Sequence, residues 1–295
     1  MDDLKLWSQL NEAWLEIGKK YEPVVERAAQ GKGMDLRTWS LLLAAWTFEP
    51  DDITPAHLIV RGPYTSPEAY LSRLVSAAQA GYLTEAEPGK FRLTERGRKL
   101  TLDLVALGRE VMAGADPLSS TDAQFLRQLL ERLVQSCLDT PPPPEIWSIQ
   151  LSCKLMPPPE PPLPFIEQAL SALAAYRDDA HLAAWQDTHL SATALETLTL
   201  LWNGEVNSLA DLCKRLERRG HTCKVYSDVL EDLKAHGLIN GSDQALWLTG
   251  AGRVFRNQIE DDTNRYFFAP WASLSQDERG DMARLFGQVI EGLKG

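Results

Sequence analysis

The sequence predicts a mainly α-helical protein made of two equivalent units, each carrying one small β-hairpin. Apolar residues recur at three-and-four spacing along most of the chain, which is typical of packed helices. The last hundred or so residues also repeat the pattern of an earlier stretch at a shift of 155 to 156 positions. The corresponding positions include Trp46 and Trp202, Gly81 and Gly237, Thr94 and Thr249, and Gly97-Arg98 and Gly252-Arg253. Apolar spacing alone would not keep these features in register, so we interpret the two stretches as copies of one unit.

The elements of the first half follow from helix caps, glycines and proline-containing turns. Thr54-Pro55 and Ser66-Pro67 each combine an N-cap residue with a proline at the first helical position. Two short strands flanking Glu87-Pro88-Gly89 predict a hairpin. The predicted helices of this half are Leu4–Ala29, Leu36–Phe48, Thr54–Gly62, Ser66–Gly81, a long helix from Thr94, and Thr121–Leu138.

The second half repeats this order. Its hairpin is expected around Gly241-Ser242-Asp243, and two shorter helical segments replace the long first helix. The predicted helices are Pro164–Tyr176, Asp179–Trp185, Thr193–Trp202, Ser208–Arg219, Thr222–His236, a helix from Thr249, and Gln276–Leu293. We therefore divide the chain into a first unit at 1–140, a proline-rich connector at 141–163 and a second unit at 164–295.

Composition limits the partners and the compartment. The 295 residues, 44% of them apolar, can bury two cores of ordinary domain size. The net charge of -11 disfavours non-specific binding to nucleic acids and anionic membranes. No window of about 18 uninterrupted apolar residues occurs and no leader pattern is visible, so we expect a cytoplasmic protein with no membrane partner. The four cysteines show no C-x-x-C spacing, which favours reduced thiols.

Three helices, a hairpin and a long helix are the order of a winged helix-turn-helix. With helices before and after each winged unit, the chain resembles the MarR-type transcription regulators. That resemblance implies flanking helices that build a dimer interface and winged units that read duplex DNA. In the second half, Asp178–Trp185, Leu248–Arg253, Ile259–Thr263 and Pro270-Trp271 are similar to the corresponding phrases of the SalK-like helix-turn-helix family, which is MarR-like. Here both protomers would be fused in one chain, either as a monomeric pseudo-dimer or as a homodimer of such chains.

The expected DNA contacts divide into phosphate and base contacts. Binding needs Lys and Arg near phosphates and a second helix whose side chains reach base edges in the major groove. The expected phosphate-binding residues are Lys90, Arg92, Arg96 and Arg98 of the first wing region and Lys214, Arg215, Arg218, Arg219 and Lys224 of the second turn. The residues expected nearest to bases are Ser66, Tyr70 and Arg73, together with Thr222, Tyr226 and Ser227.

A different function is also open, because the charge pattern is mixed. Arg73 is the only cation of the first recognition helix, and the second carries Asp228, Glu231 and Asp232. The alternative is a winged-helix scaffold that binds a ligand or a protein and no longer contacts DNA. Nine tryptophans fall mostly on predicted apolar faces, so a small apolar ligand between helices is one reading and core packing the other.

Metal and catalytic chemistry have weaker support. Cys213, His221 and Cys223 are close in sequence but lack the spacing of a four-ligand zinc site. We interpret Asp178-Asp179 as an acidic helix cap followed by a histidine, His181, at the edge of the core. The chain contains no nucleophile elbow, P-loop or dinucleotide glycine fingerprint. We therefore expect no catalytic residues, no metal and no cofactor, and a protein that is not an enzyme.

Overall fold

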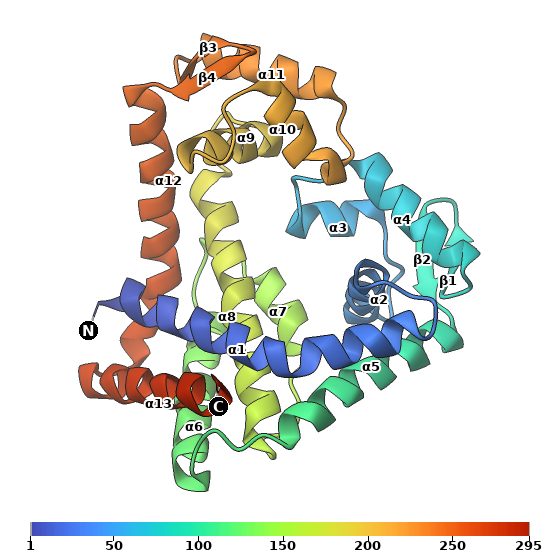
Figure 1. Cartoon of the computed structure of the whole chain (residues 1–295), viewed down its shortest axis with the longest axis vertical. Coiled ribbons are helices and arrows are strands. Elements are labelled where there is room, and N and C mark those ends of the chain that lie inside the picture. Colours follow the sequence, from blue (N-terminus) through green and yellow to red (C-terminus); the bar gives the residue numbers. More distant parts are fainter. Residues whose placement is uncertain (1, 295) are drawn as a thin grey trace.

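The computed structural model describes residues 2–294, which form thirteen α-helices, two short 3-10 helices and two antiparallel hairpins (Figure 1). The predicted fold class, mainly helical with two small hairpins, is confirmed. The two halves contain the same elements in the same order. Matching elements begin 154 to 156 positions apart, except for the first helix of each half.

The first half runs from a long helix to the helix that precedes the connector. Its winged unit consists of α2, α3, α4, the β1–β2 hairpin and α5. The bounds are α1 Asp3–Gln30, α2 Leu36–Phe48, α3 Pro55–Arg61, α4 Pro67–Gln79, β1 Leu83–Glu87, β2 Lys90–Leu93, α5 Glu95–Ala113 and α6 Ser120–Leu138.

The second half begins after a short connector helix, α7 Trp147–Cys153. Its winged unit consists of α9, α10, a 3-10 turn, α11, the β3–β4 hairpin and α12. The bounds are α8 Pro162–Trp185, α9 Ala192–Trp202, α10 Leu209–Arg215, η1 Glu217–Arg219, α11 Cys223–Ala235, β3 Ile239–Ser242, β4 Ala245–Leu248, α12 Gly250–Phe268, η2 Ala269–Ser273 and α13 Gln276–Lys294.

The same local contacts start the long helix after each hairpin. Thr94 caps α5 by accepting from the Gly97 amide, and its hydroxyl donates to the Gly81 and Tyr82 carbonyls, which follow α4. Thr249 does the same for α12 through Gly252. A Cβ atom on Gly97 would lie 2.1 Å from the Tyr82 carbonyl oxygen, and one on Gly252 would lie 2.0 Å from that of Leu238. Glycine is therefore required where each long helix crosses its hairpin.

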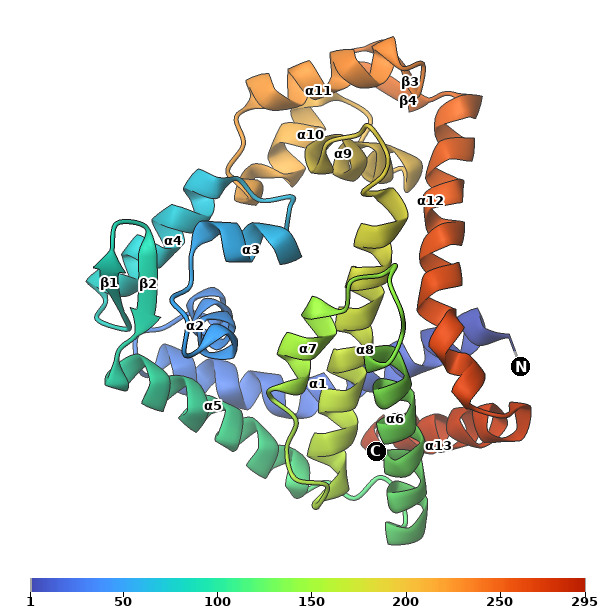
Figure 2. The ribbon, with the colours of Figure 1, turned by 180° about the vertical axis from the view of Figure 1, so that it is seen from behind.

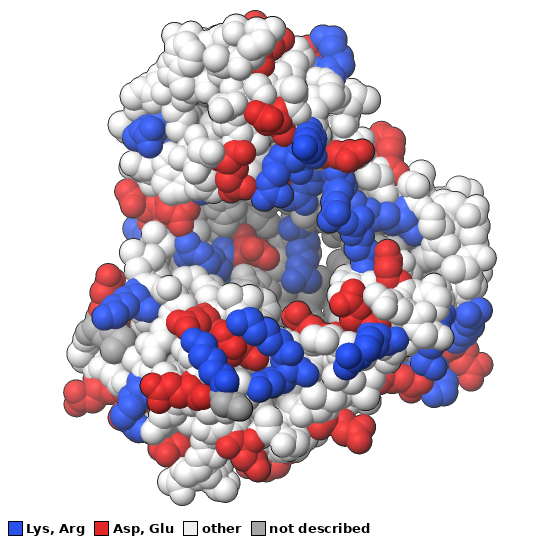
Figure 3. All heavy atoms as spheres, in the orientation of Figure 1, with Lys and Arg blue, Asp and Glu red and all other residues white. Residues whose placement is uncertain are grey.

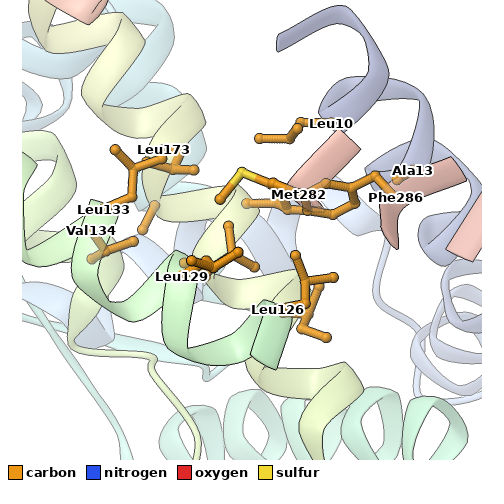
Figure 4. Close-up of a cluster of buried hydrophobic side chains, with 14 of the residues drawn as sticks. Leu10, Ala13, Leu126, Leu129, Leu133, Val134, Leu173, Met282 and Phe286 are labelled. Atoms are coloured by element: carbon orange, nitrogen blue, oxygen red, sulfur yellow. The ribbon is translucent and has the colours of Figure 1, made fainter. Parts of the chain in front are cut away.

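The flanking helices form one body shared by both halves. α1 packs against α13 of the second half, and α8 packs in turn against α6 of the first half. A hydrogen bond of 2.8 Å from the Gln9 side chain to the Ala283 carbonyl joins the first pair. Figure 4 shows the side chains that meet in this body: Leu10 and Ala13 from α1, Leu126, Leu129, Leu133 and Val134 from α6, Leu173 from α8, and Met282 and Phe286 from α13. This reciprocal exchange gives the body a pseudo-two-fold arrangement.

Each winged unit has a core of its own, separate from the shared body. Leu74 and Phe91 are fully buried in the first, and Leu198 and Leu230 in the second. Both ribbon views show the two units projecting from the body and meeting each other at α4 and the turn between α10 and α11 (Figures 1 and 2). The position of each winged unit is thus determined both by its long helix and by its contact with the other unit.

The structure differs from the sequence-based expectations at α8 and at Trp247, and the single helix predicted at Ser208–Arg219 is divided into α10 and η1. α8 is one continuous helix, so the two segments predicted at Pro164–Tyr176 and Asp179–Trp185 are wrong as separate helices. Trp247 in β4 is 53% exposed, unlike the core tryptophans Trp185 and Trp271. The broad apolar surface of α8, which packs against α6, α7 and α12, concealed its continuity by weakening the helical periodicity.

Candidate nucleic-acid interface

The second helix-turn-helix consists of α10, the 3-10 turn and α11. Gly220 ends the turn in the left-handed region, at φ 78°, and Thr222 is the N-cap residue of α11. Tyr226 and Leu230 point into the core of the unit and hold α11 in place. Thr222 and Lys224 at the start of α11 are exposed, and Ser227 is partly exposed. Tyr226 is only 1% exposed and its hydroxyl donates to the Leu216 carbonyl, so the prediction that it lies near bases is wrong in this arrangement.

Several predicted phosphate-binding cations of the second unit lie on its surface. Lys214 and Arg218 are exposed, and neither forms an ion pair within residues 2–294. Arg215 pairs with Glu205, and Lys224 pairs with Asp228 one helical turn further along α11. Exposed pairs of this kind contribute little to stability, so these two cations can exchange a carboxylate for a phosphate at small cost.

Arg219 differs from these because its partner is largely buried. Its Nε donates to Oε1 of Glu196 over 2.9 Å, and its guanidinium lies 5.5 Å from the centre of the Tyr64 ring. Glu196 Oε2 has no hydrogen-bond partner among the described residues, and burial raises the pKa of this carboxyl. Removing Arg219 would leave Glu196 without its counter-charge, which gives Arg219 a structural role.

The first recognition helix, α4, is less accessible than predicted. Ser66 is only 3% exposed; it is the N-cap of α4, and its hydroxyl accepts from the Ala69 amide. The Tyr70 hydroxyl donates to the Gly62 carbonyl over 3.0 Å. Arg73 donates to the Arg218 carbonyl over 2.8 Å. The prediction that Ser66 lies near bases is therefore wrong in this arrangement, and Tyr70 and Arg73 are engaged in contacts within the protein.

The predicted cations of the first wing region lie on an exposed surface, but each has a contact in the protein. Lys90 pairs with Glu87 across the hairpin turn. Arg92 forms two hydrogen bonds with Asp52, and Arg98 pairs with Glu49. The Arg96 guanidinium lies 4.9 Å from the centre of the Tyr82 ring. Asp52 and Glu49 lie just after α2, 40 and 49 positions before the arginines they contact, so the sequence gave no indication of these two pairs.

The two helix-turn-helix units contact each other directly. The Ser66 amide donates to the Arg219 carbonyl over 2.8 Å, and the His221 ring nitrogen lies 3.2 Å from the Tyr64 carbonyl. A Cβ atom on Gly220 would lie 2.5 Å from that of Ala69. The N-terminal end of α4 is thus covered by the turn of the second unit. No periodicity or motif in the sequence indicated this contact, because it joins residues about 150 positions apart.

Arginines gather at this contact around a pocket of about 390 Å³. They come from α2, α4, α10 and the 3-10 turn, and Glu196 is the only acidic residue of the lining. The lining consists of Arg37, Thr65, Arg73, Glu196, Leu200, Arg215, Leu216, Arg218 and Arg219. Figure 3 shows Lys and Arg side chains gathered around the hollow between the winged units and the body. Four predicted DNA-binding arginines are therefore collected between the units, with Arg37 as a member that the sequence did not indicate.

A second pocket, of about 220 Å³, lies in the body beside the first winged unit. Trp14 and Tyr21 of α1, Trp39 of α2 and Met112 of α5 contribute to its mainly apolar lining. Glu167 of α8 is buried there and accepts hydrogen bonds from the Trp14 indole and the Tyr21 hydroxyl, over 3.1 and 3.0 Å. Burial raises the pKa of this carboxyl. Tryptophans thus line a pocket as well as the core.

The cysteine and acidic clusters have structural roles that differ from the predicted ones. Cys213 and Cys223 form a disulfide with a Cα–Cα distance of 5.5 Å, so the expectation of reduced thiols is wrong for this pair. The turn between α10 and α11 brings them together, which their sequence spacing did not reveal. Asp179 lies within α8 and accepts from the Ser148 and Ile149 amides, so it caps α7 and not its own helix. His181 lies 3.1 Å from the Thr263 hydroxyl.

Residues 2–294 contain no cluster of three or more His, Cys, Asp or Glu side chains suited to a metal ion. Within the same residues, no helix is long and apolar enough to span a bilayer.

Comparison with known proteins supports the assignment of the second half. Residues 152–294 match the profile of a helix-turn-helix family, and this segment extends from the end of α7 through α13. No curated protein matches the chain significantly. No solved structure matches it significantly either. The match and the order of α9 to α12 agree, and the second half of this chain therefore contains a helix-turn-helix domain.

Proposed function

We propose that this protein is a MarR-like transcriptional regulator that binds duplex DNA through two winged-helix units derived from one duplicated unit. The matching order of elements and the reciprocal packing of α1 on α13 and of α8 on α6 support this proposal. In such an arrangement the flanking helices take the place of a dimer interface. A single chain would then present two recognition helices related by the internal pseudo-two-fold axis.

The observation that carries the proposal is the exposed cationic surface at the N-terminal end of α11. Lys214, Arg218 and Lys224 are accessible there, next to the exposed Thr222 and the partly exposed Ser227. A recognition helix contacts bases with its N-terminal residues while nearby cations hold the backbone phosphates. The acidic residues of α11 begin at Asp228, beyond this end.

On this proposal, the contact between the units corresponds to a closed form of the regulator. The N-terminal end of α4 is covered by residues 217–220, so a base cannot reach Ser66 until the units separate. Two recognition helices that enter successive major grooves on one face are about 34 Å apart from centre to centre. Opening would rotate the winged units on the shared body and expose the first unit's cations together with those of the second.

The proposed site for an apolar effector is the aromatic pocket in the body. It lies between α1, α2, α5 and α8, so its occupancy would affect how the first winged unit sits on the body. An aromatic ligand with one hydrogen-bond donor would fit a lining of indole and phenol rings around the Glu167 carboxyl. Such a ligand would shift the balance between closed and open forms.

Binding to a randomised duplex library at low salt tests the DNA proposal. We expect Lys214→Gln/Lys224→Gln to lower retention at least tenfold and to reduce the slope of log Kd against log salt by about two. Neither lysine lines the arginine pocket, and neither supports the core. The control, Lys19→Gln/Lys20→Gln on α1, carries the same change of charge outside both winged units. Equal retention by both double variants and the wild type would overturn the proposal.

The second candidate function is a winged-helix scaffold that does not contact DNA. The covered end of α4 and the acidic residues Asp228, Glu231 and Asp232 on α11 favour it. This function predicts that the wild type is not retained on any duplex, including at low salt. It also predicts that variants which force the units apart do not gain retention.

A further inference from the structure

The pocket between the winged units carries more positive charge than its own ion pairs neutralise. Five arginines and one glutamate line it. Glu196 is paired with Arg219, and Arg215 pairs with Glu205 outside the lining. Arg37, Arg73 and Arg218 form no ion pair within residues 2–294. Three guanidinium groups therefore line one hollow without a carboxylate in ion-pair contact among residues 2–294. Besides the hydrogen bond from the Thr38 amide, the positive charge of Arg37 helps to lower the pKa of Asp35.

These three arginines come from separate parts of the fold. Arg37 belongs to α2 and Arg73 to α4 of the first unit, whereas Arg218 belongs to the 3-10 turn of the second. Arg73 is held in place by its bond to the Arg218 carbonyl and by the Tyr70 ring, 5.5 Å from its guanidinium. A ligand that bound all three would connect the two winged units. The pocket would then be complete only while the units are closed.

The chemistry of the lining favours phosphate groups. A guanidinium binds phosphate oxygens through two parallel hydrogen bonds, and three of them can share a ligand with several adjacent oxygens and two or more negative charges. A single carboxylate offers one such edge and one charge. Leu200 and Leu216 supply apolar surface beside the arginines, and the pocket volume of about 390 Å³ leaves room for an organic group.

We propose that this pocket binds a small organic oligophosphate, of the nucleoside diphosphate type, which fastens the two winged units together. The diphosphate lies among Arg37, Arg73 and Arg218, and the organic group lies against Leu200 and Leu216. Binding stabilises the closed form because the ligand contacts both units at once. This inference concerns a ligand and a closure that do not require DNA, so it stands or falls separately from the proposed function.

Calorimetric titration with inorganic pyrophosphate and with adenosine diphosphate tests the site. We expect both to bind at an ionic strength matched with sodium chloride, and the double variant Arg37→Gln/Arg218→Gln to bind at least tenfold more weakly. These two side chains form no hydrogen bond within residues 2–294, so their replacement leaves the fold intact. The control is Arg253→Gln on α12, an exposed arginine outside the pocket that also forms no ion pair within those residues. Its affinity should stay within twofold of the wild type.

Hydrogen exchange provides a second readout that surface binding would not change. The Ser66 amide donates to the Arg219 carbonyl across the two units, so its exchange reports their separation. Pyrophosphate should slow exchange of a peptide spanning residues 64–70 in the wild type and not in the double variant. Three results would overturn the proposal: equal loss of affinity in the Arg253 control, equal binding of citrate, or exchange at Ser66 that pyrophosphate does not alter.

Discussion

The backbone amide of Ser66 donates a 2.8 Å hydrogen bond to the carbonyl oxygen of Arg219, across 153 positions of the chain. Ser66 is the N-cap of α4 in the first winged unit, and Arg219 lies in the turn between α10 and α11 of the second. The buried Ser66 amide needs this partner, because an unpaired backbone group in the interior is costly. The N-terminal end of α4 therefore depends on the second unit for this hydrogen bond.

Substitution of Gly220 should separate the two units. A Cβ atom at this position would lie 2.5 Å from Ala69 Cβ and 3.0 Å from Ser66 Oγ. We expect Gly220→Ala to speed hydrogen exchange at Ser66 more than tenfold and to enlarge the radius of gyration measured by small-angle scattering. On the proposed function, it should also increase retention on duplex DNA.

The matched control for this variant is Gly204→Ala. Both glycines adopt positive φ, 78° and 72°, so alanine at either one incurs a similar backbone strain of about 1 kcal/mol. No atom lies within 4 Å of a Cβ placed on Gly204. A rise in Ser66 exchange that is equal in both variants would mean that strain alone, and not contact between the units, is responsible.

Gly252 should tolerate no side chain, because the Leu238 carbonyl oxygen lies where its Cβ would be. We expect Gly252→Ala to lower the free energy of unfolding by about 3 kcal/mol, measured by urea denaturation. Gly250→Ala, two residues earlier in the same helix with open space around it, should change that free energy by less than about 0.5 kcal/mol. Similar losses from both variants would contradict the crowding at residue 252.

His181 should make a destabilising contribution to the second half in mild acid. Burial and the nearby Arg256 charge lower the pKa of its imidazole from 6.5 to about 4. The unfolded chain therefore binds the proton more readily, so stability present above pH 6.5 is lost as the pH falls towards 4. When the pH falls from 7 to 5, this histidine should lower the free energy of unfolding by about 2 kcal/mol.

Asp179 acts in the opposite direction, because burial raises the pKa of its carboxyl to about 6. The stability that this carboxyl contributes is lost as the pH rises from about 4 towards 6.

Comparing the wild type with His181→Gln at each pH isolates the effect of the histidine. The difference in their free energies of unfolding should change by about 2 kcal/mol between pH 7 and pH 5. The control is His236→Gln, because the His236 side chain is exposed. A difference that stays constant for His181→Gln would show that its imidazole is not buried in the neutral form.

Local rules predicted most of the elements, whereas contacts between the halves escaped them. Thr94 and Thr249 were recognisable as helix starts because capping depends on residues three positions away. Apolar spacing likewise identified the surfaces of α6 and α13 that meet in the shared body. These features need only the sequence near each element.

The arrangement at the candidate interface depends on long-range packing. Arg73 appeared as a lone cation on a recognition helix, yet it donates to Arg218 in the other unit. Tyr226 appeared next to a polar turn, yet its ring packs inside the second core. Both side chains have the polarity expected for DNA contact. The contact with the other unit engages Arg73, whereas packing within its own unit buries Tyr226.

If both proposals hold, pyrophosphate should antagonise DNA binding by stabilising the closed form. At matched ionic strength, saturating pyrophosphate should raise the Kd for a bound duplex about tenfold, measured by fluorescence anisotropy. Arg37→Gln distinguishes closure from simple competition, because Arg37 lines the pocket but belongs to neither recognition helix. This variant should bind DNA as tightly as the wild type without pyrophosphate and lose most of the antagonism. Undiminished antagonism in Arg37→Gln would mean that pyrophosphate competes directly for the cations that hold DNA phosphates, since such competition does not require a filled pocket between the units.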